Sequence, residues 1–161
     1  MKIIGFLFWI VLVLAILLVV FGQLGMLKGK TPSNLGVQDG KLKLPSKTPN
    51  SVSSQAHLYP DHPQHAYAAI EPFKFTGDAD FAMEKLANLL QKGERTTVVK
   101  RDPGYIYAQC STKLLKYTDD VEFWLDKPAG VIHVRSSSRL GRKDLGVNRA
   151  RVESIRAEFN S

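Results

Sequence analysis

The chain has 161 residues, with 22 Lys and Arg against 15 Asp and Glu, which gives a formal net charge of +7. This length allows one domain and little more. The single cysteine, Cys110, excludes an internal disulfide.

The N-terminal segment is apolar from Ile3 to Leu27, a run of 25 residues without a charged side chain. As a helix rising about 1.5 Å per residue it would span roughly 37 Å, enough to cross a hydrocarbon core of about 30 Å. A cleaved signal peptide has a shorter apolar region and a small-residue cleavage site, and no such site or lipoprotein cysteine follows here. We therefore expect residues 1–2 to form a short flank and residues 3–27 an uncleaved transmembrane signal anchor. A cleaved signal is the alternative.

The orientation of this span can be argued in two ways. The short N-terminal side carries Lys2 and the free amine, whereas Lys28, Lys30, Lys41 and Lys43 follow the span. Counted literally, the positive-inside rule would put the C-terminal part in the cytoplasm. However, a short basic start followed directly by a long apolar run is typical of an exported single-pass protein. We expect the domain to lie outside the cytoplasm.

Residues 28–65 are rich in Gly, Pro, Ser, Asn and Lys and hold few large apolar side chains. This composition predicts a linker that leads into an extended arm. Residues 28–50, with five Lys against one Asp, follow the predicted span, where anionic headgroups attract basic side chains. The membrane surface therefore accounts for the basic charge of this segment, and we expect no nucleic acid as a partner. The folded domain should occupy residues 66–161.

This domain should begin with a strand and a helix. Residues 67–75 are typical of a strand, which Pro72 would keep at an edge of the sheet. Residues 76–92 predict a helix that Asp78 caps and Gly93 ends. The apolar face of this helix should be formed by Phe81, Leu86, Leu89 and Leu90.

Two hairpins and a second helix complete the domain. A turn at residues 102–104 joins the first two strands, and a four-residue loop, 127–130, joins the second two. In the second hairpin, the alternation of apolar and polar side chains on both faces fits one register, in which Glu122 lies opposite Arg135. A helix should follow over residues 146–159. The sequence thus predicts an α+β fold: an antiparallel sheet of about five strands with two helices on one face, in the order strand, helix, four strands, helix, preceded by one transmembrane helix.

Several stretches of this sequence resemble the uncharacterised family known as domain of unknown function 1499. They are "VSSQA", "YTDDVEFWLD" and "GVIHVRSSSRLGRKDLGVNRARVESIR", and the resemblance extends over roughly residues 45–160. It implies no activity, substrate or cofactor, but it implies a location in the bacterial cell envelope. We therefore expect a single-pass protein of the inner membrane with a periplasmic domain. Many members carry two cysteines where this chain has Ser46 and Ser51, so any chemistry of those cysteines is not carried over.

Three clustered carboxylates, Asp119, Asp120 and Glu122, are candidate catalytic residues. Neighbouring carboxylates can raise one another's pKa and act as general acid and base, which would suit a hydrolase. The alternative is structural, because the predicted register sets Glu122 against Arg135 as a cross-strand ion pair.

Arg139, Arg142 and Arg149 surround a glycine-containing turn that leads into the last helix. Guanidinium groups near the exposed N–H groups of a helix start can bind a phosphate or carboxylate. On the alternative interpretation, Asp144 or Asn148 caps the helix and fills that position.

A metal site is not expected. The segment from His57 to His65 holds three His and Asp61, but its spacing matches no established zinc site and two prolines interrupt it. We expect no cofactor. The sequence favours a membrane-anchored, non-catalytic module that binds an anionic ligand or an envelope protein through its arginines. A hydrolase that uses the clustered carboxylates and a purely structural envelope protein are the alternatives.

Overall fold

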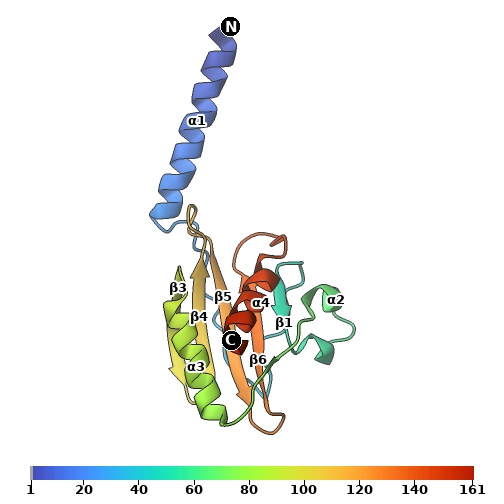
Figure 1. Cartoon of the computed structure of the whole chain (residues 1–161). Coiled ribbons are helices and arrows are strands. Elements are labelled where there is room, and N and C mark those ends of the chain that lie inside the picture. The colour runs from blue at the N-terminus through green and yellow to red at the C-terminus, as the bar shows by residue number, and fades with distance from the viewer. Residues whose placement is uncertain (1) are drawn as a thin grey trace.

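The computed structural model describes residues 2–161, so Met1 of the predicted flank lies outside the described residues. A long N-terminal helix precedes a sheet that two helices cover on one face (Figure 1). The helical elements are α1 (Lys2–Gln23), a 3-10 turn η1 (Ala56–Leu58), α2 (His65–Ala68), α3 (Ala79–Lys92) and α4 (Val147–Asn160). The strands are β1 (Ser51–Ser53), β2 (Phe73–Lys74), β3 (Thr96–Asp102), β4 (Tyr105–Ser111), β5 (Thr118–Asp126) and β6 (Val131–Ser138).

The six strands form one antiparallel sheet in the order β1-β6-β5-β4-β3, and β2 also pairs with β6. This confirms the predicted α+β architecture with two helices on one face. The β5–β6 register is also the predicted one, since Asp126 pairs with Val131 and Glu122 lies opposite Arg135. The hairpin is specified by its sequence because a shift by one residue would turn every apolar side chain to the wrong face.

Helices α3 and α4 pack on one face of the sheet and enclose the main core. Phe73 of β2 lies at its centre, with its ring edge-on to Phe123 and Phe159. Asp78 caps α3 by accepting a hydrogen bond from the Phe81 N–H at 2.8 Å. The expectation for Phe81 itself was wrong, because its side chain is 70% exposed. The buried stripe of α3 starts one residue later and consists of Ala82, Met83, Leu86, Ala87 and Leu90.

The other face of the sheet is covered by chain that the sequence predicts as linker. Leu42 is buried against Tyr105 and Tyr107, and Leu35 and Val37 pack around them. The same predicted segment, residues 28–65, also supplies β1, which extends the sheet beyond β6. The structure thus differs from the expectation of a linker and arm here. A few apolar side chains spaced among glycines and lysines are sufficient to bury Tyr105 and Tyr107 on this face.

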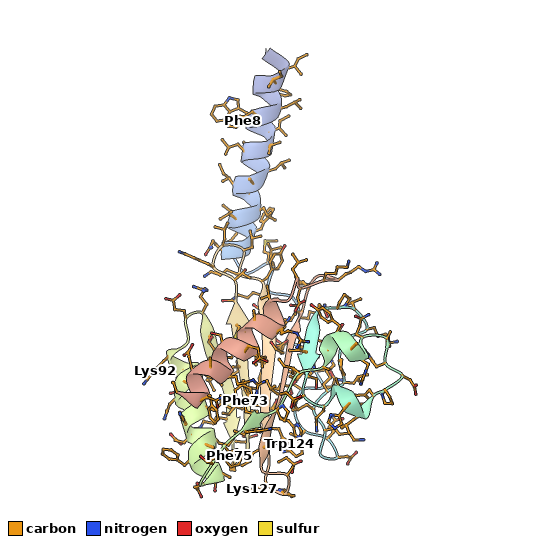
Figure 2. The ribbon with its side chains drawn as sticks, turned by 45° about the vertical axis from the view of Figure 1, so that its right-hand side comes forward. Phe8, Phe73, Phe75, Lys92, Trp124 and Lys127 are labelled. Atoms are coloured by element: carbon orange, nitrogen blue, oxygen red, sulfur yellow. The ribbon has the colours of Figure 1, made fainter. Side chains whose placement is uncertain are left out.

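Helix α1 is apolar over Ile3–Gln23 and is long enough to cross a membrane, although a signal sequence has the same character. Its end touches the domain. Gln23 donates a hydrogen bond from its side chain to the carbonyl of Leu114 at 2.8 Å. Gly22 lies so close to the backbone of Leu115 that a Cβ at this position would be 2.7 Å from the carbonyl oxygen. Figure 2 shows α1 standing at one end of the domain, with Lys127 at the opposite end.

Candidate functional site

Glu122 and Arg135 form a buried ion pair on the sheet face that residues 35–42 cover. The Arg135 Nη1 lies 3.3 Å from a Glu122 carboxylate oxygen, and both side chains are almost completely buried. The other carboxylate oxygen accepts hydrogen bonds from the Tyr105 hydroxyl at 2.9 Å and from the Gly36 N–H at 2.7 Å. Burial lowers the pKa of Arg135, and Glu122 opposes that effect. Burial, together with Glu122, raises the pKa of Tyr105.

Asp120 is held on the same face by a second arginine. The Arg139 guanidinium donates two hydrogen bonds to its carboxylate, at 2.9 and 2.7 Å, and the Tyr107 hydroxyl donates a third at 2.6 Å. This fork arrangement is among the strongest that an arginine can make with a carboxylate. The hydrogen bond to Asp120 is also the main reason why the pKa of Arg139 is raised.

Asp119 points to the opposite face of the sheet, because neighbouring residues in a strand alternate. There it forms an ion pair with Arg151 of α4. The three candidate carboxylates therefore do not share one site, since Asp120 and Glu122 lie under residues 35–42 while Asp119 faces α4. Each is paired with a different arginine.

The three candidate arginines also separate. Arg139 is bound to Asp120, and Arg142 is exposed on the loop before α4. Arg149 donates from its Nη2 to the carbonyls of Tyr67 and Ala69, at 2.7 and 2.8 Å. The structure thus places only Arg149 beside a cavity, which is described below.

The start of α4 is occupied by a carboxylate of the chain itself. Asp144 accepts hydrogen bonds from the N–H groups of Gly146 and Asn148, at 3.0 and 3.1 Å, and from the Tyr67 hydroxyl. Burial would raise the pKa of Asp144, but these donors outweigh it and hold that pKa below its usual value. An external anion therefore finds the position in front of the helix already filled.

The cavity opens at a break in the outer edge of β6. β1 pairs with β6 at residues 135–137 and β2 pairs at residues 131–132, so residues 133 and 134 face neither strand. A cavity of about 590 Å³ lies at this break. Among the side chains that line it are Ser54, His57, Glu71, His133, Arg149 and Glu153.

Ser54 bridges the break and orients His133. Its hydroxyl oxygen accepts the Val134 N–H at 2.9 Å and lies 3.0 Å from His133 Nδ1. The other ring nitrogen is 3.7 Å from an Asp126 oxygen, and Trp124 stacks on the ring. The order Ser, His, Asp resembles a nucleophilic triad, but Ser54 is buried and its oxygen is engaged with the strand. Burial lowers the pKa of His133, which favours the neutral form of its ring.

Arg149, His57 and the exposed Glu71 are the polar side chains of this cavity that can contact a ligand. Arg149 makes both of its hydrogen bonds through Nη2, so among residues 2–161 its Nη1 and Nε have no protein acceptor. His57 is exposed and holds its Nδ1 3.2 Å from the Ser54 carbonyl. Its Nε2 has no hydrogen-bond partner among residues 2–161. Of the two carboxylates at the cavity, Glu153 is already bound to Arg156.

The part of the chain that the structure describes contains no group of three or more His, Cys, Asp or Glu side chains suited to a metal. In the histidine-rich segment, His62 instead accepts the Gln64 N–H at 3.1 Å and stabilises a turn.

Sequence reasoning missed the pairing of Ser54 with His133. The two residues are 79 positions apart, and Ser54 belongs to the segment predicted as an arm. No motif or apolar period marks such a contact, because only the unpredicted strand β1 brings Ser54 to β6.

Comparison with known proteins gives one family match. A family model described as "Protein of unknown function (DUF1499)" matches residues 41–159. No curated protein matches the chain. The matched range starts beside Leu42, within the segment that covers the second face of the sheet, and ends at Phe159 near the end of α4.

Proposed function

The chain belongs to the DUF1499 family, and we propose that it is a single-pass membrane protein whose domain binds a small anionic ligand without catalysing a reaction. The contacts at the end of α1 support retention of this helix as an anchor. Gln23 and Gly22 pack against residues 114 and 115 of the domain, and a signal peptide that is removed has no need of such contacts. The bacterial inner membrane and a periplasmic domain fit the short N-terminal flank.

The observation that carries the binding function is that Arg149 lines the cavity while its Nη1 and Nε have no protein acceptor among residues 2–161. Phosphate and carboxylate oxygens accept hydrogen bonds from an arginine. Both forks of a guanidinium include Nη2, which the two carbonyls occupy, so Nη1 and Nε each offer a single donor here. The cavity volume of about 590 Å³ lies within the range of roughly 300–1,000 Å³ that small-molecule sites occupy. His57 adds a second polar contact at the same cavity.

Binding is favoured over hydrolysis because the candidate carboxylates are already engaged. General acid–base catalysis requires a carboxylate that can exchange a proton with the substrate. Asp119, Asp120 and Glu122 are buried, and each is paired with an arginine. A substrate would have to displace these partners first.

The proposed site can be tested with inorganic phosphate as the simplest probe. We expect sodium phosphate, at constant ionic strength, to raise the thermal unfolding midpoint of the full-length protein in nanodiscs, since a ligand that binds only the folded state stabilises it. Arg149→Met should weaken the affinity derived from this shift by about tenfold or more, because hydrogen bonds to charged groups contribute about 1.5–3 kcal/mol.

Arg142→Met is the matched control, because it removes an exposed arginine that does not line the cavity. It should leave the phosphate effect unchanged. A phosphate effect that persists in Arg149→Met, or that both variants lose equally, would contradict the proposed site.

A further inference from the structure

Two loops meet at the end of the domain where α1 joins it. One loop, residues 112–117, connects β4 to β5, and the other, residues 139–146, connects β6 to α4. The antiparallel register sets Ser111 against Thr118 and Asp119 against Ser138, so both loops leave the sheet at the same end. In Figure 1 this is the end on which α1 stands.

The end of α1 contacts the first loop, and the residues that follow the helix contact the second. Gln23 is hydrogen bonded to the carbonyl of Leu114. Gly29, a few residues after the helix, lies against Arg139 and Leu140. The two loops are therefore adjacent to the point where the chain would leave a bilayer. We call the exposed side chains of residues 112–117 and 139–146 the proximal surface.

The proximal surface exposes several large apolar side chains. Leu114 is 59% exposed, Leu140 45% and Leu145 91%. Leu145 also has a φ of 53°, in the left-handed region that side chains other than glycine, asparagine and aspartate rarely adopt. An exposed leucine held in an unfavourable backbone conformation is a candidate for a contact outside the domain.

The charged residues of these two loops are basic with one exception. The two loops contain Lys113, Lys116, Arg142 and Lys143, besides the paired Arg139. Their only acidic residue is Asp144, and hydrogen bonds from Tyr67, Gly146 and Asn148 bind its carboxylate within the domain. Apolar side chains interleaved with basic ones are typical of a surface that lies in a membrane interface.

We propose that the proximal surface rests on the bilayer, with Leu114, Leu140 and Leu145 in the interface and the basic side chains at anionic lipid phosphates. The inference depends on the proposed anchoring by α1, because that helix brings the surface to the membrane. Docking of this kind fixes the orientation of the domain. The β5–β6 turn around Lys127 then points away from the bilayer (Figure 2).

A tryptophan placed in the proximal surface can report this contact. We expect the added emission of Leu145→Trp, in full-length protein in nanodiscs containing phosphatidylglycerol, to be quenched strongly by lipids brominated near the headgroup end of their acyl chains. Ala129→Trp is the matched control, since it lies on the exposed β5–β6 turn, and its added emission should be almost unaffected. Both positions are exposed, so neither substitution should disturb the core.

Charge reversal tests the lipid class. Arg142→Glu with Lys143→Glu should reduce the quenching of Leu145→Trp severalfold, and replacing phosphatidylglycerol by phosphatidylcholine should do the same. Quenching that neither change reduces would overturn the role of anionic lipid, and equal quenching at positions 145 and 129 would overturn the docking itself. Native Trp9 lies in α1 and tests the anchoring by α1 independently of the docking. If the emission of Trp9 is not quenched, α1 does not span the bilayer and the anchoring has failed.

Discussion

Glu122→Ala is expected to lower the free energy of unfolding by about 3–5 kcal/mol, because it leaves the buried guanidinium of Arg135 without its counter-charge. The Tyr105 hydroxyl and the Gly36 N–H lose their acceptor in the same substitution. Urea unfolding of the full-length protein, followed by the circular dichroism of the domain, measures the change.

Two further variants identify the cause of this loss. Glu84→Ala breaks the exposed pair with Arg101 and should cost less than about 1 kcal/mol. Combining Glu122→Leu with Arg135→Met removes both charges and should recover much of the stability that Glu122→Ala loses, because no charge is then left buried alone. A cost below about 1 kcal/mol for Glu122→Ala would contradict a dry, buried pair under residues 35–42.

Leu42→Ala is expected to destabilise the domain by about 2–5 kcal/mol, as truncation of a core leucine does. Leu42 is 2% exposed and packs on Tyr105 and Tyr107. Its N–H also donates to the Gln55 side chain at 2.8 Å, so the segment is held by a polar contact as well as an apolar one. The same urea unfolding experiment measures the effect.

Leu44→Ala is the control for this prediction, because Leu44 belongs to the same segment but is 44% exposed. It should cost far less than Leu42→Ala. If the two substitutions had equally small effects, residues 35–44 would be a linker, as their composition predicts, and not part of the fold.

The parts of the fold that the sequence predicts well are those with a regular pattern. In β5 and β6, apolar and charged residues alternate on both strands, and only one register satisfies both faces. The cap of α3 is similarly local, since Asp78 needs only the N–H three residues later.

The parts that sequence reasoning missed depend on contacts between distant segments. β1 has three residues, too few for a period to be visible, and Leu42 is an isolated apolar residue between two lysines. The pairing of Asp120 with Arg139 is not specified by the strand pattern either, because Arg139 lies just beyond the end of β6 and its orientation depends on the loop that follows. Long-range burial, not local pattern, decides each of these cases.

The distribution of arginines connects the fold with the proposed function. Arg135, Arg139 and Arg151 each neutralise a buried carboxylate, so much of the basic excess near the C-terminus serves the domain itself. Arg149 keeps part of its guanidinium open at the cavity, and Arg142 is exposed beside the membrane-proximal end. These two arginines therefore serve different proposed interactions. Arg149 would bind a soluble anion, and Arg142 would contact lipid.

Docking of the proximal surface depends on the retention of α1, and one measurement tests this retention together with the external location of the domain most directly. Alkaline phosphatase, which folds only outside the cytoplasm, is fused after Ser161, and its activity and size are followed in washed bacterial membranes. The predicted result is an active reporter that stays in the membrane fraction on the uncleaved chain, whose own part accounts for 17.9 kDa. An inactive reporter, or an active one released on a shortened chain, would contradict an anchored protein with an external domain.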